Sequence, residues 1–147
     1  MSGFWRNWLT IWCWAVGLFG LTLTGAAAEI TSGPVRLLFD IFNGPGELDL
    51  DAHMRFSVAL LGAVTLGWSL TFAAAFQAAH MLGDRSRPVW IMITASVVGW
   101  YAIDSSLSIA TGFPLNAASN TILFAAYLVP VIASGVLRTA SQAPRST

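Results

Sequence analysis

The chain has 147 residues, of which 56% are hydrophobic and only 10% are charged. About a quarter of the residues of a typical soluble domain are charged, so this composition excludes an ordinary soluble domain. It favours a membrane protein, for which the lipid bilayer is the expected partner. The formal net charge is zero, which argues against a nucleic-acid partner. All basic residues are arginine, and together with the abundant alanine and glycine this is typical of a GC-rich bacterium.

Long apolar runs predict the fold class. A helix needs roughly 20 residues to cross the hydrocarbon layer, and in lipid the backbone must satisfy its own hydrogen bonds. The sequence therefore predicts an all-α polytopic membrane protein, an antiparallel four-transmembrane-helix bundle formed by one domain, 1–138. The residues 139–147 are expected to be a disordered cytoplasmic tail. The spans are expected at about 8–28, 56–79, 89–111 and 120–137.

The first apolar run has two interpretations. Arg6, the apolar stretch and the small residues that end at Ala28 resemble a cleaved signal peptide. The run is longer than the apolar part of most signal peptides, and its tryptophans suit a membrane-interface anchor. These tryptophans are Trp5, Trp8, Trp12 and Trp14. We expect a retained first span.

The position of arginine predicts the orientation. Arginines are enriched on the cytoplasmic side of bacterial membrane proteins. The minority side contains Arg36 and Arg55, together with most of the acidic residues. The majority side contains Arg6, Arg85, Arg87, Arg138 and Arg145. Both termini are therefore expected to be cytoplasmic in a bacterial inner membrane, with the multi-pass chain exposing residues 29–55 outside.

The outer loop, residues 29–55, contains a helix signal of its own. Thr31 or Ser32 can cap a helix, Pro34 suits its first turn, and a Gly-Pro-Gly sequence after Asn43 ends it. The apolar residues between them predict a short amphipathic helix in the membrane interface, between spans one and two. This helix is expected to be a lid on the bundle or, alternatively, a docking surface or a gate.

The acidic end of this loop invites two interpretations. Asp49 or Asp51 can cap the second span. With Glu47 and His53 these carboxylates could instead suggest a divalent cation site, but the spacing lacks the pattern and central glycine of a calcium loop. Capping is the expected role, and no metal is predicted.

Small residues recur at every fourth position of the second span and predict a close helix contact. Their partner is expected to be the first span, which offers Gly20 at similar spacing, or alternatively a second copy of the chain. The row of small residues in the second span begins with Ala59, Ala63, Gly67 and Thr71.

Pro130 lies inside the fourth span and should kink it and free the carbonyl of Ala126.

The residues that often carry chemistry are few. His53 and His80 bracket the second span and lie on opposite sides of the membrane, so they cannot share a metal ion or a haem. Cys13 is the only cysteine and lies in an apolar run, so it is expected to be buried and inert. No nucleophile–base or phosphate-loop motif is present. Neither a catalytic residue nor a cofactor is predicted, and an enzyme is disfavoured.

Asp104 is the residue that most requires explanation, because an ionised carboxylate inside a span is costly unless it faces protein or water. Polar groups at similar depth in the other spans are expected to surround it. The expected cluster comprises Asp104, Ser108, Tyr127, Asn116, Asn120, Arg55 and Thr65. The cluster is interpreted as a clamp between helices or, alternatively, as a proton- or ligand-binding site open to the outside.

These observations predict a small, non-catalytic accessory or interaction protein, either a subunit of a larger membrane complex or a homo-oligomer. The first alternative is a small transporter or sensor that uses the Asp104 cluster. The second is a membrane enzyme that acts on lipid or quinone.

Overall fold

The computed structural model describes residues 1–43 and 49–138, and the regular secondary structure of this part of the chain is helical. The predicted stop after Asn43, the acidic residue Glu47 and the predicted tail 139–147 lie outside the described residues. The helices are α1 (Gly3–Thr24), α2 (Gly33–Asn43), α3 (Ala52–Leu82), α4 (Arg87–Ala110) and α5 (Pro114–Ser134), with 3-10 turns η1 (Gly25–Ala27), η2 (Glu29–Thr31) and η3 (Gly83–Arg85).

Three helical segments in the described part are long and apolar enough to cross a membrane. They are Gly3–Ala27, Ala52–Arg85 and Pro114–Ser134. The helix α4 is of comparable length, but Asp104 and the serines beside it lower its hydropathy. The chain is thus an all-helical protein with three helices suited to a membrane.

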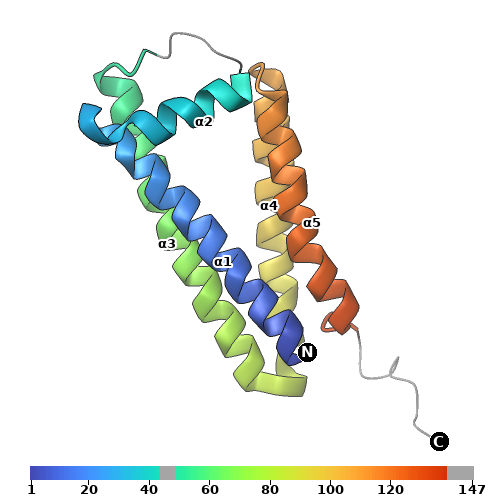
Figure 1. Cartoon of the computed structure of the whole chain (residues 1–147). Coiled ribbons are helices and arrows are strands. Elements are labelled where there is room, and N and C mark those ends of the chain that lie inside the picture. Colours follow the sequence, from blue (N-terminus) through green and yellow to red (C-terminus); the bar gives the residue numbers. More distant parts are fainter. Residues whose placement is uncertain (44–48, 139–147) are drawn as a thin grey trace, which may run out of the picture.

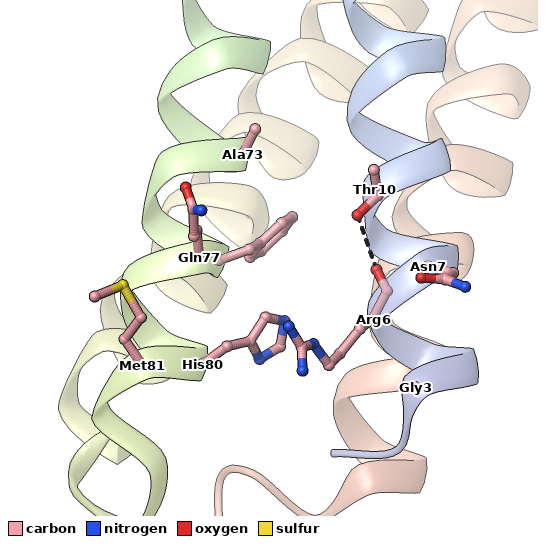
Figure 2. Close-up of a pocket in the computed structure, with 9 residues that line it drawn as sticks. Gly3, Arg6, Asn7, Thr10, Ala73, Gln77, His80 and Met81 are labelled. Atoms are coloured by element: carbon pink, nitrogen blue, oxygen red, sulfur yellow. Dashed lines mark hydrogen bonds between the residues drawn. The ribbon is translucent and has the colours of Figure 1, made fainter.

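The long helices form two antiparallel pairs, α1 with α3 and α4 with α5 (Figure 1). The pairs meet near the end that holds the N-terminus, where α1 contacts α5 and α3 contacts α4, and they diverge toward the other end. There α2 crosses from one pair to the other and contacts both α1 and α5. Near the N-terminus, side chains of α1 and α3 line a pocket of about 620 Å³ (Figure 2).

Helices α1 and α3 approach most closely at two glycines. A Cβ placed on Gly62 would lie 2.5 Å from the backbone nitrogen of Thr24 and 2.6 Å from the carbonyl oxygen of Gly20. Further along the same contact, the Ser69 hydroxyl donates a hydrogen bond of 2.7 Å to the carbonyl of Cys13. Only glycine permits this separation, because any side chain on Gly62 would meet backbone atoms that cannot move away.

The small-residue row does not make this contact. A Cβ on Gly67 would meet no atom within 4 Å, and Ala63 and Thr71 are exposed, while Ala59 is half-buried. The predicted packing of the row against the first span is therefore wrong, although α1 and α3 do pack together. Small residues occur on more than one face of α3, and sequence spacing alone cannot choose between those faces.

Pro130 explains how α1 attaches to α5. Proline has no N–H to donate to the carbonyl four residues earlier, so the Ala126 oxygen loses its helical partner. The indole N–H of Trp8 donates to that oxygen over 2.8 Å. One turn further along α1, the indole of Trp12 donates to the Leu123 carbonyl over 2.9 Å. Two tryptophans of α1 thus hydrogen-bond to the backbone of α5.

Two apolar clusters hold the helices together. The larger one is buried among α1, α3, α4 and α5 and includes Leu9, Trp12, Phe76, Trp90 and Tyr127. The smaller one lies under α2 and consists of Leu23, Ala26, Val35 and Val58. Because α2 contributes a fully buried valine to the smaller cluster while Leu37 and Ile41 stay exposed, it rests on the bundle with one face only.

The helix ends differ from the apolar runs by several residues. Helix α5 begins at Pro114 rather than near residue 120, because proline suits a first helical turn. It ends before Gly135, which adopts a left-handed φ of 66°. Helix α3 begins at Ala52, and the expected cap is confirmed, since the Asp51 carboxylate accepts a hydrogen bond of 2.8 Å from the Met54 N–H.

The glycine contact can be tested by two matched substitutions in α3. We expect Gly62→Leu to destabilise the chain by about 2 kcal/mol or more, because the new side chain meets the α1 backbone. Gly67→Leu should change the stability of the isolated chain little. Unfolding in mild detergent measures both, and equal losses would contradict the assigned contact.

The role of Trp8 can be tested by a double-mutant cycle with Pro130. Trp8→Phe leaves the Ala126 carbonyl without its donor and should cost about 1 kcal/mol. In a Pro130→Ala background the backbone N–H at 130 can serve that carbonyl, so the same change should cost less. Trp12→Phe is the control, because its acceptor is not freed by proline. Additive costs for Trp8 and Pro130 would exclude the assignment.

Candidate functional site

The Asp104 carboxylate lies between α4 and α5 and accepts three side-chain hydrogen bonds on one oxygen. Its Oδ1 accepts from the Asn120 amide at 2.7 Å, the Asn116 amide at 3.1 Å and the Ser108 hydroxyl at 3.2 Å. The Asn116 amide also donates to the Ser108 oxygen at 2.8 Å, and the Ser108 hydroxyl lies 2.7 Å from the Asp104 carbonyl. These four residues are called the Asp104 cluster.

The turn between α4 and α5 aligns the four side chains. Residues four apart share one face of a helix, so Asp104 and Ser108 point to the same side of α4, and Asn116 and Asn120 to the same side of α5. The turn is short because Gly112 adopts a φ of 88° and the Phe113 N–H donates to the Ser108 carbonyl over 2.7 Å. The early start of α5 places Asn116 within the helix rather than in a loop.

The cluster is partly enclosed. Ser108 and Asn120 are 6% and 7% exposed, whereas Asp104 and Asn116 are half-buried. The donors are neutral amides and a hydroxyl, with no cation among them. Because the two amides come from α5 and the carboxylate from α4, these hydrogen bonds link the two helices. The other carboxylate oxygen of Asp104, Oδ2, accepts no hydrogen bond from these three donors.

Two predicted members lie elsewhere. The Tyr127 hydroxyl is 2.9 Å from the Thr94 hydroxyl and is fully buried in the larger core, so it serves the packing of α5 on α4 away from Asp104. The Thr65 hydroxyl donates to the Leu61 carbonyl of its own helix over 2.8 Å. Tyr127 lies about two turns beyond Asn120 on α5, and Thr65 belongs to the α1–α3 pair, which diverges from α4 and α5 away from the N-terminal end (Figure 1).

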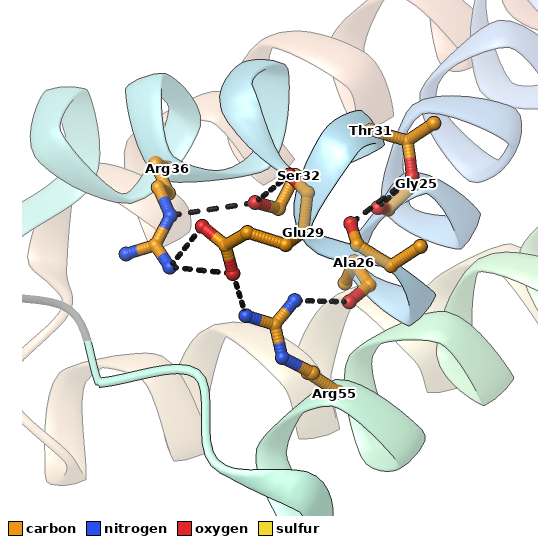
Figure 3. Close-up of polar contacts among 8 residues, drawn as sticks. Gly25, Ala26, Glu29, Thr31, Ser32, Arg36 and Arg55 are labelled. Atoms are coloured by element: carbon orange, nitrogen blue, oxygen red, sulfur yellow. Dashed lines mark hydrogen bonds and ion pairs between the residues drawn. The ribbon is translucent and has the colours of Figure 1, made fainter.

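Arg55 does not reach Asp104 and instead joins the segment that follows α1 to the start of α3, at the end of the molecule opposite the N-terminus (Figure 3). Its guanidinium donates to the Ala26 carbonyl over 3.2 Å and forms an ion pair with Glu29. Glu29 also pairs with Arg36 of α2 at 3.1 Å. The hydrogen bond from Arg55 is the main reason that the pKa of Glu29 is lowered, so this carboxylate stays ionised. Glu29 and Arg55 are the first and last residues of the segment 29–55. Their opposite charges at its two ends are the signal in the sequence from which this ion pair could have been predicted.

Groups suited to catalysis or metal binding do not converge in the described part of the chain. Among residues 1–43 and 49–138, no three of histidine, cysteine, aspartate and glutamate lie close enough to hold a metal ion. Cys13 is a buried free thiol. The Asp104 cluster can therefore hold two helices together or bind a hydrogen-bonding group or a proton.

Comparison with protein-family models, with curated proteins and with solved structures found no match.

Two substitutions at Asp104 separate its charge from its hydrogen bonds. Asp104→Asn keeps an acceptor oxygen for the amides of Asn116 and Asn120, so we expect a loss of about 1 kcal/mol or less. Asp104→Leu leaves both amides without that acceptor and should cost about 2 to 3 kcal/mol. Thermal unfolding in mild detergent measures the difference. Ser106→Leu, at an exposed position of α4, is the control for adding an apolar side chain, and a similar loss there would contradict the clamp.

Proposed function

We propose that the chain crosses the membrane four times, with α4 as the additional span. Helix α4 runs antiparallel beside α5 and has 24 residues, or about 36 Å at the helical rise, enough for the hydrocarbon layer. A helix packed along a spanning neighbour must cross with it. In this arrangement α2 lies at the outer interface, with Leu37 and Ile41 directed to lipid.

The proposed orientation places both termini in the cytoplasm of a bacterium and the chain in the inner membrane. Arg6 begins α1, Arg85 and Arg87 lie between α3 and α4, and Arg138 follows α5, so the order of the helices places all four at one end. This distribution supports the positive-inside orientation. A retained α1 is supported by its contribution to the larger core and by its indole hydrogen bonds to α5.

The proposed role is that of a non-catalytic accessory or interaction protein. The observation that supports it is the Asp104 cluster, in which the only carboxylate of the four long helices is bound by donors of its own hairpin. A carboxylate that joins two helices accounts for its presence without a substrate. Three members of the small-residue row, Ala63, Gly67 and Thr71, are exposed within the chain and are suited to a neighbouring helix, from a second copy or from another subunit.

A transporter or sensor is the second candidate, and one observation favours it. Asp104 is only half-buried, and its Oδ2 receives none of the donors that bind Oδ1. A proton or a hydrogen-bonding ligand could reach that oxygen from the outer side. Under this function Asp104→Asn would give a stable protein without activity, whereas the interaction role predicts that the variant keeps its contacts.

Cysteine cross-linking in native membranes tests the interaction role. We expect Gly67→Cys to form an oxidative cross-link along the exposed row, because this position is open within the chain, and the mass of the product identifies a second copy or another subunit. Leu61→Cys is the control, since Leu61 is also exposed but lies about a third of a turn away around α3. The buried Cys13 should stay unreactive. No cross-link at 67, or equal cross-linking at 61, would contradict the proposal.

A further inference from the structure

The pocket between α1 and α3 gathers donor groups at one end of the molecule (Figure 2). It lies near the N-terminus, has a volume of about 620 Å³, and is lined by Arg6, Asn7 and Thr10 of α1 and by Gln77 and His80 of α3. Figure 2 shows the Arg6 guanidinium beside the His80 ring, with Gln77 about one turn before His80 on α3. Phe76 and Ala73 line the part nearer the middle of the helices.

The charge around this pocket favours an anion. Its lining contains a guanidinium, an imidazole and two amides, and it contains no carboxylate. Within the described residues, the only ion pairs join Glu29 to Arg36 and Arg55 at the opposite end, so Arg6 has no acidic partner.

The chemistry of the lining selects the class of ligand. Guanidinium and amide N–H groups donate to phosphate oxygens, and a hydrogen bond to a charged oxygen is stronger than one between neutral groups. The apolar part formed by Phe76 and Ala73 continues the pocket toward the membrane interior. A pocket with donors at the helix ends and apolar residues deeper in suits a molecule with an anionic head and an apolar tail.

We propose that this pocket binds a phosphate group, with Arg6 and His80 as its main contacts and Gln77 as a further donor. The phosphate belongs to the headgroup of an anionic phospholipid in the cytoplasmic leaflet or to a free phosphate compound. The proposal rests on the proposed membrane orientation for the lipid source only. It does not depend on the interaction role or on the Asp104 cluster.

The test uses the full chain in mild detergent and compares three probes. These are phosphatidylglycerol, phosphatidylcholine with the same acyl chains, and inorganic phosphate. We expect phosphatidylglycerol to raise the unfolding temperature and to remain bound in native mass spectrometry, and phosphatidylcholine to do so much less. Arg6→Gln should weaken retention about tenfold, since it removes a charged donor. Arg85→Gln is the control, because it removes the same charge at the same end outside the pocket.

Each outcome decides the proposal. Loss in Arg6→Gln with retention in Arg85→Gln supports the pocket, and stabilisation by inorganic phosphate equal to that by phosphatidylglycerol identifies a free phosphate as the ligand. Equal losses in both variants, or equal binding of the two lipids without any effect of phosphate, would overturn it. His80→Gln provides a second pocket variant if Arg6→Gln does not fold. Cross-linking at Gly67 is a separate readout, so failure of one proposal leaves the other distinguishable.

Discussion

The close approach of α1 to α3 at Gly20 and Gly62 is the constraint on which the rest of the structure depends. It fixes the rotation of α1, because a Cβ on Gly62 would lie 2.5 Å from the backbone nitrogen of Thr24, closer than van der Waals contact allows. With α1 held in that rotation, its indole side chains point to α5 and its Cys13 carbonyl faces the Ser69 hydroxyl. The first helix thereby joins one pair to the other.

Several polar groups in the long helices are satisfied by their own helix or by a neighbouring one, whereas the buried hydroxyl of Ser105 in α4 has no hydrogen-bond partner in the described part of the chain. The carbonyl freed by Pro130 receives the indole of Trp8 from another helix. The Asp104 carboxylate receives amides from the next helix along the chain. Threonine hydroxyls such as that of Thr65 donate to their own helix. The exposed polar side chains are thus concentrated at the two ends of the molecule. Helix α2 lies at one end, and the pocket lined by Arg6 lies at the other.

The two ends differ in charge and therefore in what they can meet. At the end opposite the N-terminus Glu29 forms ion pairs with two arginines and holds α2 against the α1–α3 pair. At the other end Arg6 has no acidic partner among the described residues, and its neighbours are donors. Arginine therefore stabilises the fold at one end, whereas at the other end the Arg6 side chain is available to bind an anion.

Long apolar runs and helix signals in the sequence determined the helical class, the approximate positions of the long helices, the short helix before Asn43 and the Asp51 cap, because these depend on neighbours along the chain. They also located Asp104 beside Ser108 and near the two asparagines. Only the tertiary structure decided which face of α3 meets α1, and it selected Gly62 over Gly67. It likewise separated Arg55 from Asp104. Those outcomes depend on the rotation of each helix about its axis, which the packing of all the helices sets together and which spacing along one helix does not specify.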